Sequence, residues 1–244
     1  LRARSNALRG IVNGIDYNEW DPETDRKITR NYNARNFRKE KPANKLQLQR
    51  DLGLTADSGK FMIGMVSRLT DQKGLDLIQY VMDELCAEDT QFVVLGTGDD
   101  RYENMFRHYA WKYGDRVSAQ IYYSDDMAHR IYSSCDAYLM PSLFEPCGLS
   151  QLIALRYGTV PIVRETGGLK DTVEPYNEYT SQGTGFSFAN YNAHEMLSIV
   201  NYAKSVYYGR KREWNKLIDR GMARNFSWTS SALKYQELYD WLIG

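Results

Sequence analysis

The stretch FMIGMVSRLTDQKGLDLIQYVMDELCAEDTQFVVLG, residues 61–96, contains a strand pattern, a helix pattern and a second strand pattern in succession. FMIGMVS and FVVLG are short apolar runs typical of buried strands, whereas Leu75, Ile78, Val81, Met82 and Leu85 recur at helical spacing. A strand, a helix and a strand in that order indicate a βαβ unit with parallel strands. We expect that helix to span residues 75–88.

The same alternation continues along the chain. Residues 1–60 are polar, with a loop and a short helix expected between Asn31 and Lys45, and residues 193–243 have a largely helical pattern that breaks near Gly209 and Phe226. The chain is therefore expected to be an α/β protein with a Rossmann-like parallel sheet and helices on both faces. Between residues 97 and 192 the expected helices are 101–113, 126–134 and 149–157, and the expected strands are 117–123, 137–142, 159–165 and 183–188.

Composition excludes several functional classes. The 244 residues include 31 basic and 31 acidic side chains, which cancel, so we expect no nucleic-acid partner. No run of about 18 apolar residues is present, so no membrane partner is expected. Three cysteines, Cys86, Cys135 and Cys147, lack metal-ligand spacing and favour a reducing compartment. Because Leu1 follows no initiator methionine or leader, we expect a piece of a longer polypeptide.

Ligands of open parallel sheets bind beyond the carboxyl ends of the strands, so we searched the residues that follow each apolar run. Arg68 and Lys73 follow the first run. An arginine can hold phosphate oxygens in a bidentate manner and a lysine adds a point charge, so this turn can clamp a phosphate. The alternative is a solvated loop with two unrelated surface charges.

Two further junctions carry candidate residues. After the second run, Gly96 and Gly98 let the backbone approach a ligand closely, although glycines there more often make a tight turn. In PSLFEPCGLSQL, residues 141–152, Glu145 precedes an expected helix start. Free amides and a serine hydroxyl at that start favour anionic oxygens, and a carboxylate can accept hydrogen bonds from a sugar. The alternative is a capping acid beside a structural Pro-Gly turn.

Five segments in this order and spacing resemble the glycogen/starch synthase family of the bacterial and plant type. The segments are NGIDYNEWDPETD (13–25), VSRLTDQKGLDLI (66–78), LGTGD (95–99), PSLFEPCGLSQL (141–152) and YGTVPIVRETGGLKDTV (157–173). Family members have the GT-B fold, in which two Rossmann-like domains face each other across a cleft. The resemblance implies that this chain is the carboxyl-terminal half of such a fold.

The resemblance also implies a division of the chain. Residues 1–45 would form the interdomain linker that leads into the domain, and residues 46–225 the Rossmann-like domain that binds a nucleotide sugar. Residues 226–244 would form a carboxyl-terminal helix that packs toward the amino-terminal domain, which this sequence does not contain.

Carried over by position, the resemblance implies that Arg68 and Lys73 bind the diphosphate of the donor and stabilise it as it leaves, while Glu145 contacts the donor glucose. Tyr123 would lie against the adenine, although an aromatic residue at a strand end is often only packing. Asn13 would approach the sugar, or would only form an Asx turn. The other implied donor-binding residues are Gly96, Gly98, Cys147, Gly148, Leu149, Ser150, Thr166, Gly167 and Gly168.

The implied reaction transfers glucose from ADP-glucose to the non-reducing end of an α-1,4-glucan and retains the anomeric configuration. The resemblance implies no metal and no cofactor, and a location in the cytoplasm, or in the plastid stroma if the source is a plant. We expect the chain to be inactive without its amino-terminal domain.

Two alternatives remain open at this point. Another GT-B transferase, such as a sucrose synthase or an enzyme with lipid or small acceptors, would share the Arg, Lys and Glu constellation. Such enzymes often carry a second glutamate where this chain has Ile153. A noncatalytic module that binds glucan or nucleotide is the second alternative.

Overall fold

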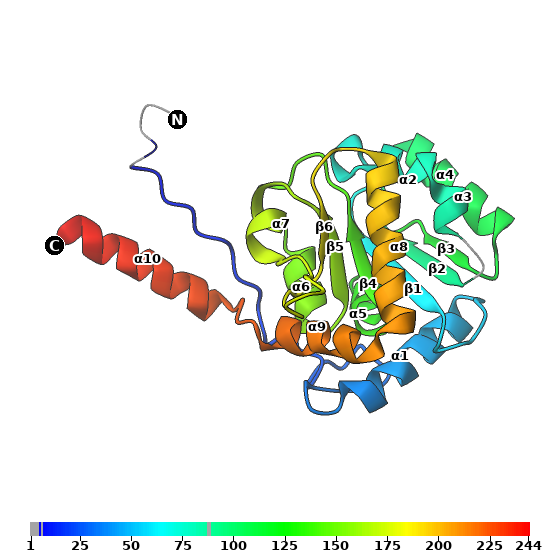
Figure 1. The fold of residues 1–244 in the computed structure, drawn as a ribbon, viewed down its shortest axis with the longest axis horizontal. Helices are drawn as coiled ribbons and strands as arrows, with labels where there is room; N and C mark the ends of the chain where they lie inside the picture. The colour runs from blue at the N-terminus through cyan, green and yellow to red at the C-terminus, as the bar shows by residue number, and fades with distance from the viewer. Residues whose placement is uncertain (1–4, 6, 87–88) are drawn as a thin grey trace.

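The computed structural model describes residues 5, 7–86 and 89–244, and within them the strands form one six-stranded parallel sheet (Figure 1). The strands are β1 (Phe61–Val66), β2 (Thr90–Leu95), β3 (Val117–Gln120), β4 (Ala137–Met140), β5 (Val160–Arg164) and β6 (Phe186–Phe188). Their order is β3-β2-β1-β4-β5-β6, with every neighbouring pair parallel. The predicted α/β fold class is confirmed.

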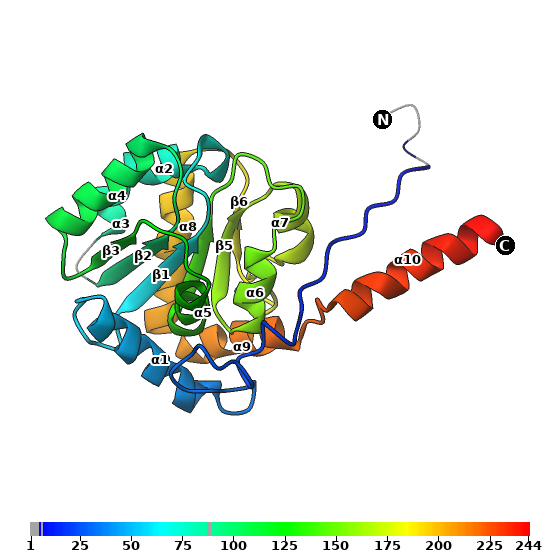
Figure 2. The same cartoon turned by 180° about the vertical axis from the view of Figure 1, so that it is seen from behind.

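Helices cover both faces of this sheet, which is why its central strands are apolar throughout. One face carries α2 (Leu75–Tyr80), α3 (Met82–Leu85) and α8 (Ala193–Gly209), with α8 in front of the sheet in Figure 1. The other face carries α5 (Asp125–Ser134) and α6 (Ser150–Arg156), which lie in front in Figure 2. All residues of β2 and β4 are buried, as expected for strands packed on both sides.

Three outer helices complete the body. α1 (Phe37–Asp51) packs against α5, α4 (Asp100–Lys112) lies against β3, and α9 (Lys211–Ala223) contacts α6 and α8. The domain boundary expected between residues 45 and 46 falls inside α1, and the expected short helix near residues 31–45 begins and ends later. Packing on α5 thus makes part of the expected linker belong to the folded body.

The helix expected over residues 75–88 is interrupted. A 3-10 turn, η2 (Asp71–Lys73), precedes α2, and Val81 leaves helical geometry with φ −122° and ψ 19° before α3 begins. The five apolar residues that suggested the helix are each at most 2% exposed, so the buried face was predicted correctly although its continuity was not. Residues 87–88 of that expectation lie outside the described residues.

Both ends of the chain leave the body on the same side (Figures 1 and 2). α10 (Trp228–Ile243) projects away, and the segment before Ile15 runs out near it. The Ile15 amide donates to the Phe226 carbonyl at 2.8 Å, and the Ser231 hydroxyl donates to the Val12 carbonyl at 2.9 Å. The ends are therefore tied together at the base of α10.

The helix breaks expected near Gly209 and Phe226 match the ends of α8 and α9. Within the described ranges, we find no helix whose length and apolar character would let it cross a bilayer.

Candidate functional site

The candidate site lies where the strand order reverses. β1 and β4 are neighbours in the sheet but far apart in sequence, so the loops that follow them emerge side by side at the carboxyl edge. This switch point is where open α/β sheets bind ligands. The first loop carries Arg68 and Lys73, and the second carries Glu145.

The two loops are joined by their backbones. The Leu143 amide donates to the Gln72 carbonyl at 2.9 Å, and the Gln72 side chain donates to the Phe144 carbonyl at 3.2 Å. Gly74 has φ +70°, and a Cβ there would overlap the carbonyl oxygen of Pro141. Gly74 is therefore required both for its backbone conformation and for the close approach of the loops.

Lys73 and Glu145 form an ion pair across this junction. The Lys73 Nζ lies 2.6 Å from Glu145 Oε2, and the Ser142 hydroxyl donates to the same oxygen at 3.2 Å. Their side chains are only 16% and 10% exposed, so each charge neutralises the other where water is scarce. An incoming anion could share Lys73, and a hydroxyl-bearing ligand could share the carboxylate.

The Arg68 side chain is exposed, and within the described part of the chain its guanidinium has no hydrogen-bond or ion-pair partner, whereas its carbonyl accepts from the Ser67 hydroxyl at 3.0 Å. It lines two adjoining cavities, one of about 130 Å³ and one of about 310 Å³. Lys73 and Ser150 line the smaller cavity too. The structure thus brings both predicted cations and the start of α6 to one cavity, with a free guanidinium at the junction to the next.

The loop before α6 is shaped by two residues. Gly148 has φ +71°, a conformation that glycine adopts without strain. Gln151 is fully buried, and its Nε2 donates to the Cys147 and Gly148 carbonyls at 3.0 Å and to the Thr172 hydroxyl at 3.1 Å. Because both carbonyls are held by Gln151, this side chain fixes the orientation of the loop. Sequence analysis missed Gln151, although a polar residue inside the apolar run SQLIAL was a usable signal.

The TGG residues support the loop from behind. A short helix, α7 (Gly167–Thr172), begins at Gly167, with Thr166 before it. The Gly168 amide donates to the Glu145 carbonyl at 3.0 Å, and a Cβ on Gly167 would overlap the same carbonyl. These glycines therefore allow α7 to press against the backbone that carries Glu145.

Gly96 and Gly98 join the second strand end to the first. A Cβ on Gly96 would overlap the Ser67 carbonyl, and one on Gly98 would overlap the Leu69 carbonyl. The Leu69 amide donates to the Thr97 carbonyl at 2.9 Å. Gly96 also lines the larger cavity, so it serves both loop packing and the cavity wall.

The larger cavity is mostly apolar and lies at the low end of the roughly 300–1,000 Å³ range of ligand pockets. Tyr123 stands at it with 90% of its surface exposed, available for a planar ligand. Ile153, in place of the second glutamate of related enzymes, is also in the wall. Side chains that line this cavity include Trp20, Leu95, Tyr122, Tyr123, Ala128 and Ile153.

The lining of these two cavities omits the predicted catalytic Glu145 and eight predicted donor-binding residues: Asn13, Gly98, Cys147, Gly148, Leu149, Thr166, Gly167 and Gly168. Asn13 is exposed at the base of α10, where a Cβ on the adjacent Gly14 would lie 2.5 Å from the Trp228 backbone. Gly14 is thus needed for this close approach. Asn13 could therefore contact a ligand only outside these two cavities.

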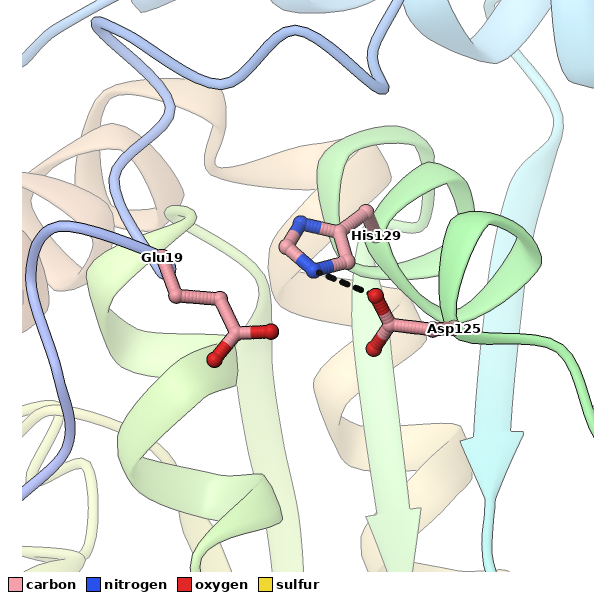
Figure 3. Close-up of side chains that lie close together, drawn as sticks. All are labelled: Glu19, Asp125 and His129. Carbon is pink, nitrogen blue, oxygen red and sulfur yellow. Dashed lines mark ion pairs between the residues drawn. The ribbon is translucent and has the colours of Figure 1, made fainter.

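Glu19, Asp125 and His129 form a cluster that sequence analysis did not identify (Figure 3). One ligand atom from each lies within 4.8 Å of the others, a set that could hold a metal ion. However, the Lys27 ammonium pairs with Asp125 and lies 3.3 Å from His129 Nε2. The hydrogen bond to Asp125 raises the pKa of Lys27, so the chain supplies its own cation to this cluster.

Groups from three parts of the chain meet around Asp25, next to that cluster. The other ring nitrogen of His129, Nδ1, lies 2.8 Å from Asp25 Oδ2, and the Tyr157 hydroxyl donates to the same oxygen at 2.7 Å. Burial raises the pKa of Asp25, but hydrogen bonds from His129, the Lys27 amide and Tyr157 outweigh it and hold that pKa below its usual value. Asp25 is therefore a buried, fully engaged carboxylate.

Comparisons with known proteins identify the family of this chain and several relatives. The Glycosyl transferases group 1 family matches residues 53–213. The glycogen synthase of Lachnospira eligens is 77% identical over 240 residues, which cover 98% of this chain and 50% of that protein. The glycogen synthase of Clostridium beijerinckii is 53% identical over 244 residues, with 100% and 50% covered.

Among solved structures, the catalytic domain of starch synthase IV from Arabidopsis thaliana, bound to ADP and acarbose, is similar with a TM-score of 0.90 and 35% sequence identity. The similarity covers 98% of this chain and 50% of that chain. This chain spans about half the length of the curated relatives that it matches.

Proposed function

This chain belongs to the group 1 glycosyl transferases, and from that premise we propose that it is the donor-binding domain of a glycogen or starch synthase. The reaction would move glucose from ADP-glucose to the non-reducing end of an α-1,4-glucan with retention of configuration. The observation that carries this proposal is the convergence of Arg68, Lys73 and Ser150 on one cavity, with the Glu145 carboxylate 2.6 Å from Lys73.

Each cavity has a role in the proposal. The apolar cavity beside Tyr123 would take the nucleoside, and the smaller one would take the diphosphate, since Arg68 stands at their junction. Glu145 would accept hydrogen bonds from the glucose and oppose the positive charge that develops on its ring. With retention, the acceptor would arrive on the face from which the diphosphate leaves, and the two cations would lie on that same face.

The two cations can stabilise the departing diphosphate without a metal ion, so we propose a reaction that needs none. The partners would be ADP-glucose or ADP, the glucan, and the amino-terminal domain that closes the cleft. The bacterial relatives support a cytoplasmic location.

The test uses the full-length polypeptide that contains this chain. Arg68→Ala should weaken binding of both ADP and pyrophosphate roughly 10- to 100-fold in calorimetry, because a charge-assisted hydrogen bond to phosphate is lost. Glu145→Gln should lower kcat about 100-fold or more with a smaller change in KM, since its charge acts mainly in the transition state. Arg107→Ala, on the outer surface of α4, is the matched control and should change neither.

Three outcomes would contradict the proposal or a part of it. If the wild-type protein bound neither ADP nor UDP, the proposed nucleotide site would not exist. Glucan formation from ADP-glucose by this 244-residue chain alone would contradict the requirement for an amino-terminal domain. Tighter binding of UDP-glucose than of ADP-glucose would favour a different nucleotide-sugar transferase.

A further inference from the structure

Trp20 comes from a segment far upstream of the sheet in sequence, yet it forms part of the wall of the 310 Å³ cavity. It is half-buried, so part of its ring system is available to the cavity. Another part of the cavity wall comes from the residues that follow β3, including the exposed Tyr123. The segment that enters the domain thus contributes an aromatic surface to the site proposed for the nucleoside.

The buried side of Trp20 is held by aromatic contacts. Its ring stacks on His129 with a centroid distance of 3.9 Å and an angle of 10° between the planes. Tyr132 and Tyr157 meet it edge-on, at 5.7 and 6.3 Å. Such geometry stabilises one orientation of an aromatic ring beyond simple burial.

His129 is in turn held by a buried carboxylate. Asp25, on the same segment as Trp20, lies 2.8 Å from His129 Nδ1. The side chains of His129 and Asp25 are 1% and 2% exposed, so this contact is shielded from water. Asp25 therefore anchors the segment to α5 at the residue on which Trp20 stacks.

A second anchor lies at the cavity rim. Lys27 pairs with Asp125, which lines the same cavity at the start of α5. Asp25 and Lys27 thus fix the segment at two points of one helix, and the Trp20 indole, stacked on His129 of that helix, has little freedom to move away.

We propose that Trp20 recognises the donor base and favours a purine, with Asp25 and His129 as positioning residues. This inference rests on the proposed function, since it specifies how the same site selects its nucleotide. A purine has two fused rings and offers more surface to an indole than the single ring of a pyrimidine. Trp20 should therefore contribute more to the binding of ADP than of UDP.

The test measures binding of ADP, UDP and pyrophosphate by calorimetry in the full-length polypeptide. Trp20→Leu should weaken the binding of ADP roughly 5- to 100-fold, which is the range for loss of one stacking contact between a base and an aromatic side chain. The loss of affinity for UDP should be at least threefold smaller than the loss for ADP, and the affinity for pyrophosphate should not change. Trp20→Phe, which keeps an aromatic face, should recover most of the ADP affinity. Trp111→Leu, a tryptophan 80% exposed on α4, is the matched control.

The positioning role has its own readout. Asp25→Asn should weaken the binding of ADP in the wild-type background but have no further effect in the Trp20→Leu background. The reason is that Asp25 would act on ADP only through the Trp20 indole. An Asp25→Asn effect of equal size in both backgrounds would overturn the positioning role.

The outcomes separate this inference from the proposed function. If Arg68→Ala weakens ADP but Trp20→Leu leaves the affinities for ADP and UDP unchanged, the inference is wrong and the proposed function stands. Equal losses for ADP and UDP would overturn the purine preference. If wild-type protein binds no nucleotide, both fail together.

Discussion

Lys41 shows that a charged residue in a polar stretch of the sequence can be buried by tertiary packing. Its ammonium is buried and donates to the Tyr132, Ser133 and Tyr157 carbonyls at 3.0–3.2 Å and to the Thr159 hydroxyl at 2.8 Å. These carbonyls lie at the ends of α5 and α6, where the helix dipole is negative. Lys41 therefore joins α1 to the ends of two helices in the body.

This placement predicts a pH dependence of stability. Burial lowers the pKa of Lys41 from 10.5 to about 7. Between pH 7 and pH 10.5 the Lys41 amine is protonated in the unfolded chain but neutral in the folded chain. The contribution of Lys41 to stability therefore rises with pH across this range, whereas below about pH 7 the penalty for its burial is constant. The free energy of unfolding of wild type, relative to Lys41→Met, should rise by up to ~4 kcal/mol between pH 7 and 10.

Urea unfolding of both proteins at several pH values measures this difference. Because other titrating groups are common to both proteins, their effects cancel. Parallel stability curves for wild type and Lys41→Met would show that Lys41 keeps its proton throughout.

At the scale of elements, the turn between β1 and α2 determines where Lys73 points. Gly74 ends that turn with φ +70°, and Gly53, after α1, has the same φ of +70° but open space around the position of a Cβ. The two glycines share this φ but differ in their surroundings, so comparing them separates backbone strain from steric overlap.

Gly74→Ala should therefore lower the free energy of unfolding by more than ~2 kcal/mol, whereas Gly53→Ala should cost only about 1 kcal/mol. The excess for Gly74 comes from overlap with the Pro141 carbonyl, which must move and take the second loop with it. Thermal and urea unfolding of both variants check the prediction. Equal losses for the two substitutions would mean that the loops are not packed as described.

At the scale of the whole molecule, α10 is an element without a covering surface. Of its residues, all of which the structure describes, only Ser231 is buried, whereas Leu233, Trp241, Leu242 and Ile243 are 55–86% exposed. Large exposed apolar surfaces of this kind mark association sites. In the proposed whole protein, the amino-terminal domain would cover this helix.

Deletion of residues 228–244 should therefore change the melting temperature of this chain by only a few degrees, since little core is lost. The deletion should also abolish self-association of the isolated chain, measured by sedimentation over a range of concentrations. Trp111→Asp removes an exposed tryptophan elsewhere and should leave self-association unchanged. A wild-type chain that stays monomeric at all concentrations would contradict the association.

The sequence by itself was sufficient for the fold class, the buried strands and the loops that carry Arg68, Lys73 and Glu145. These follow from periodicity and residue chemistry within short windows, because strand and helix patterns depend on near neighbours. The positions of the loops were also predictable, since ligands of a parallel sheet gather at its carboxyl edge.

Only the tertiary structure decided the rest. The placement of Trp20 on the same cavity as Tyr123 and of Lys41 beneath two helix ends depends on packing between segments that are distant in sequence. The ion pair of Lys73 with Glu145 has the same origin, because the sheet order places β1 next to β4. Local patterns contain no information about which distant side chain fills a space, since that choice is made by close packing of the whole core.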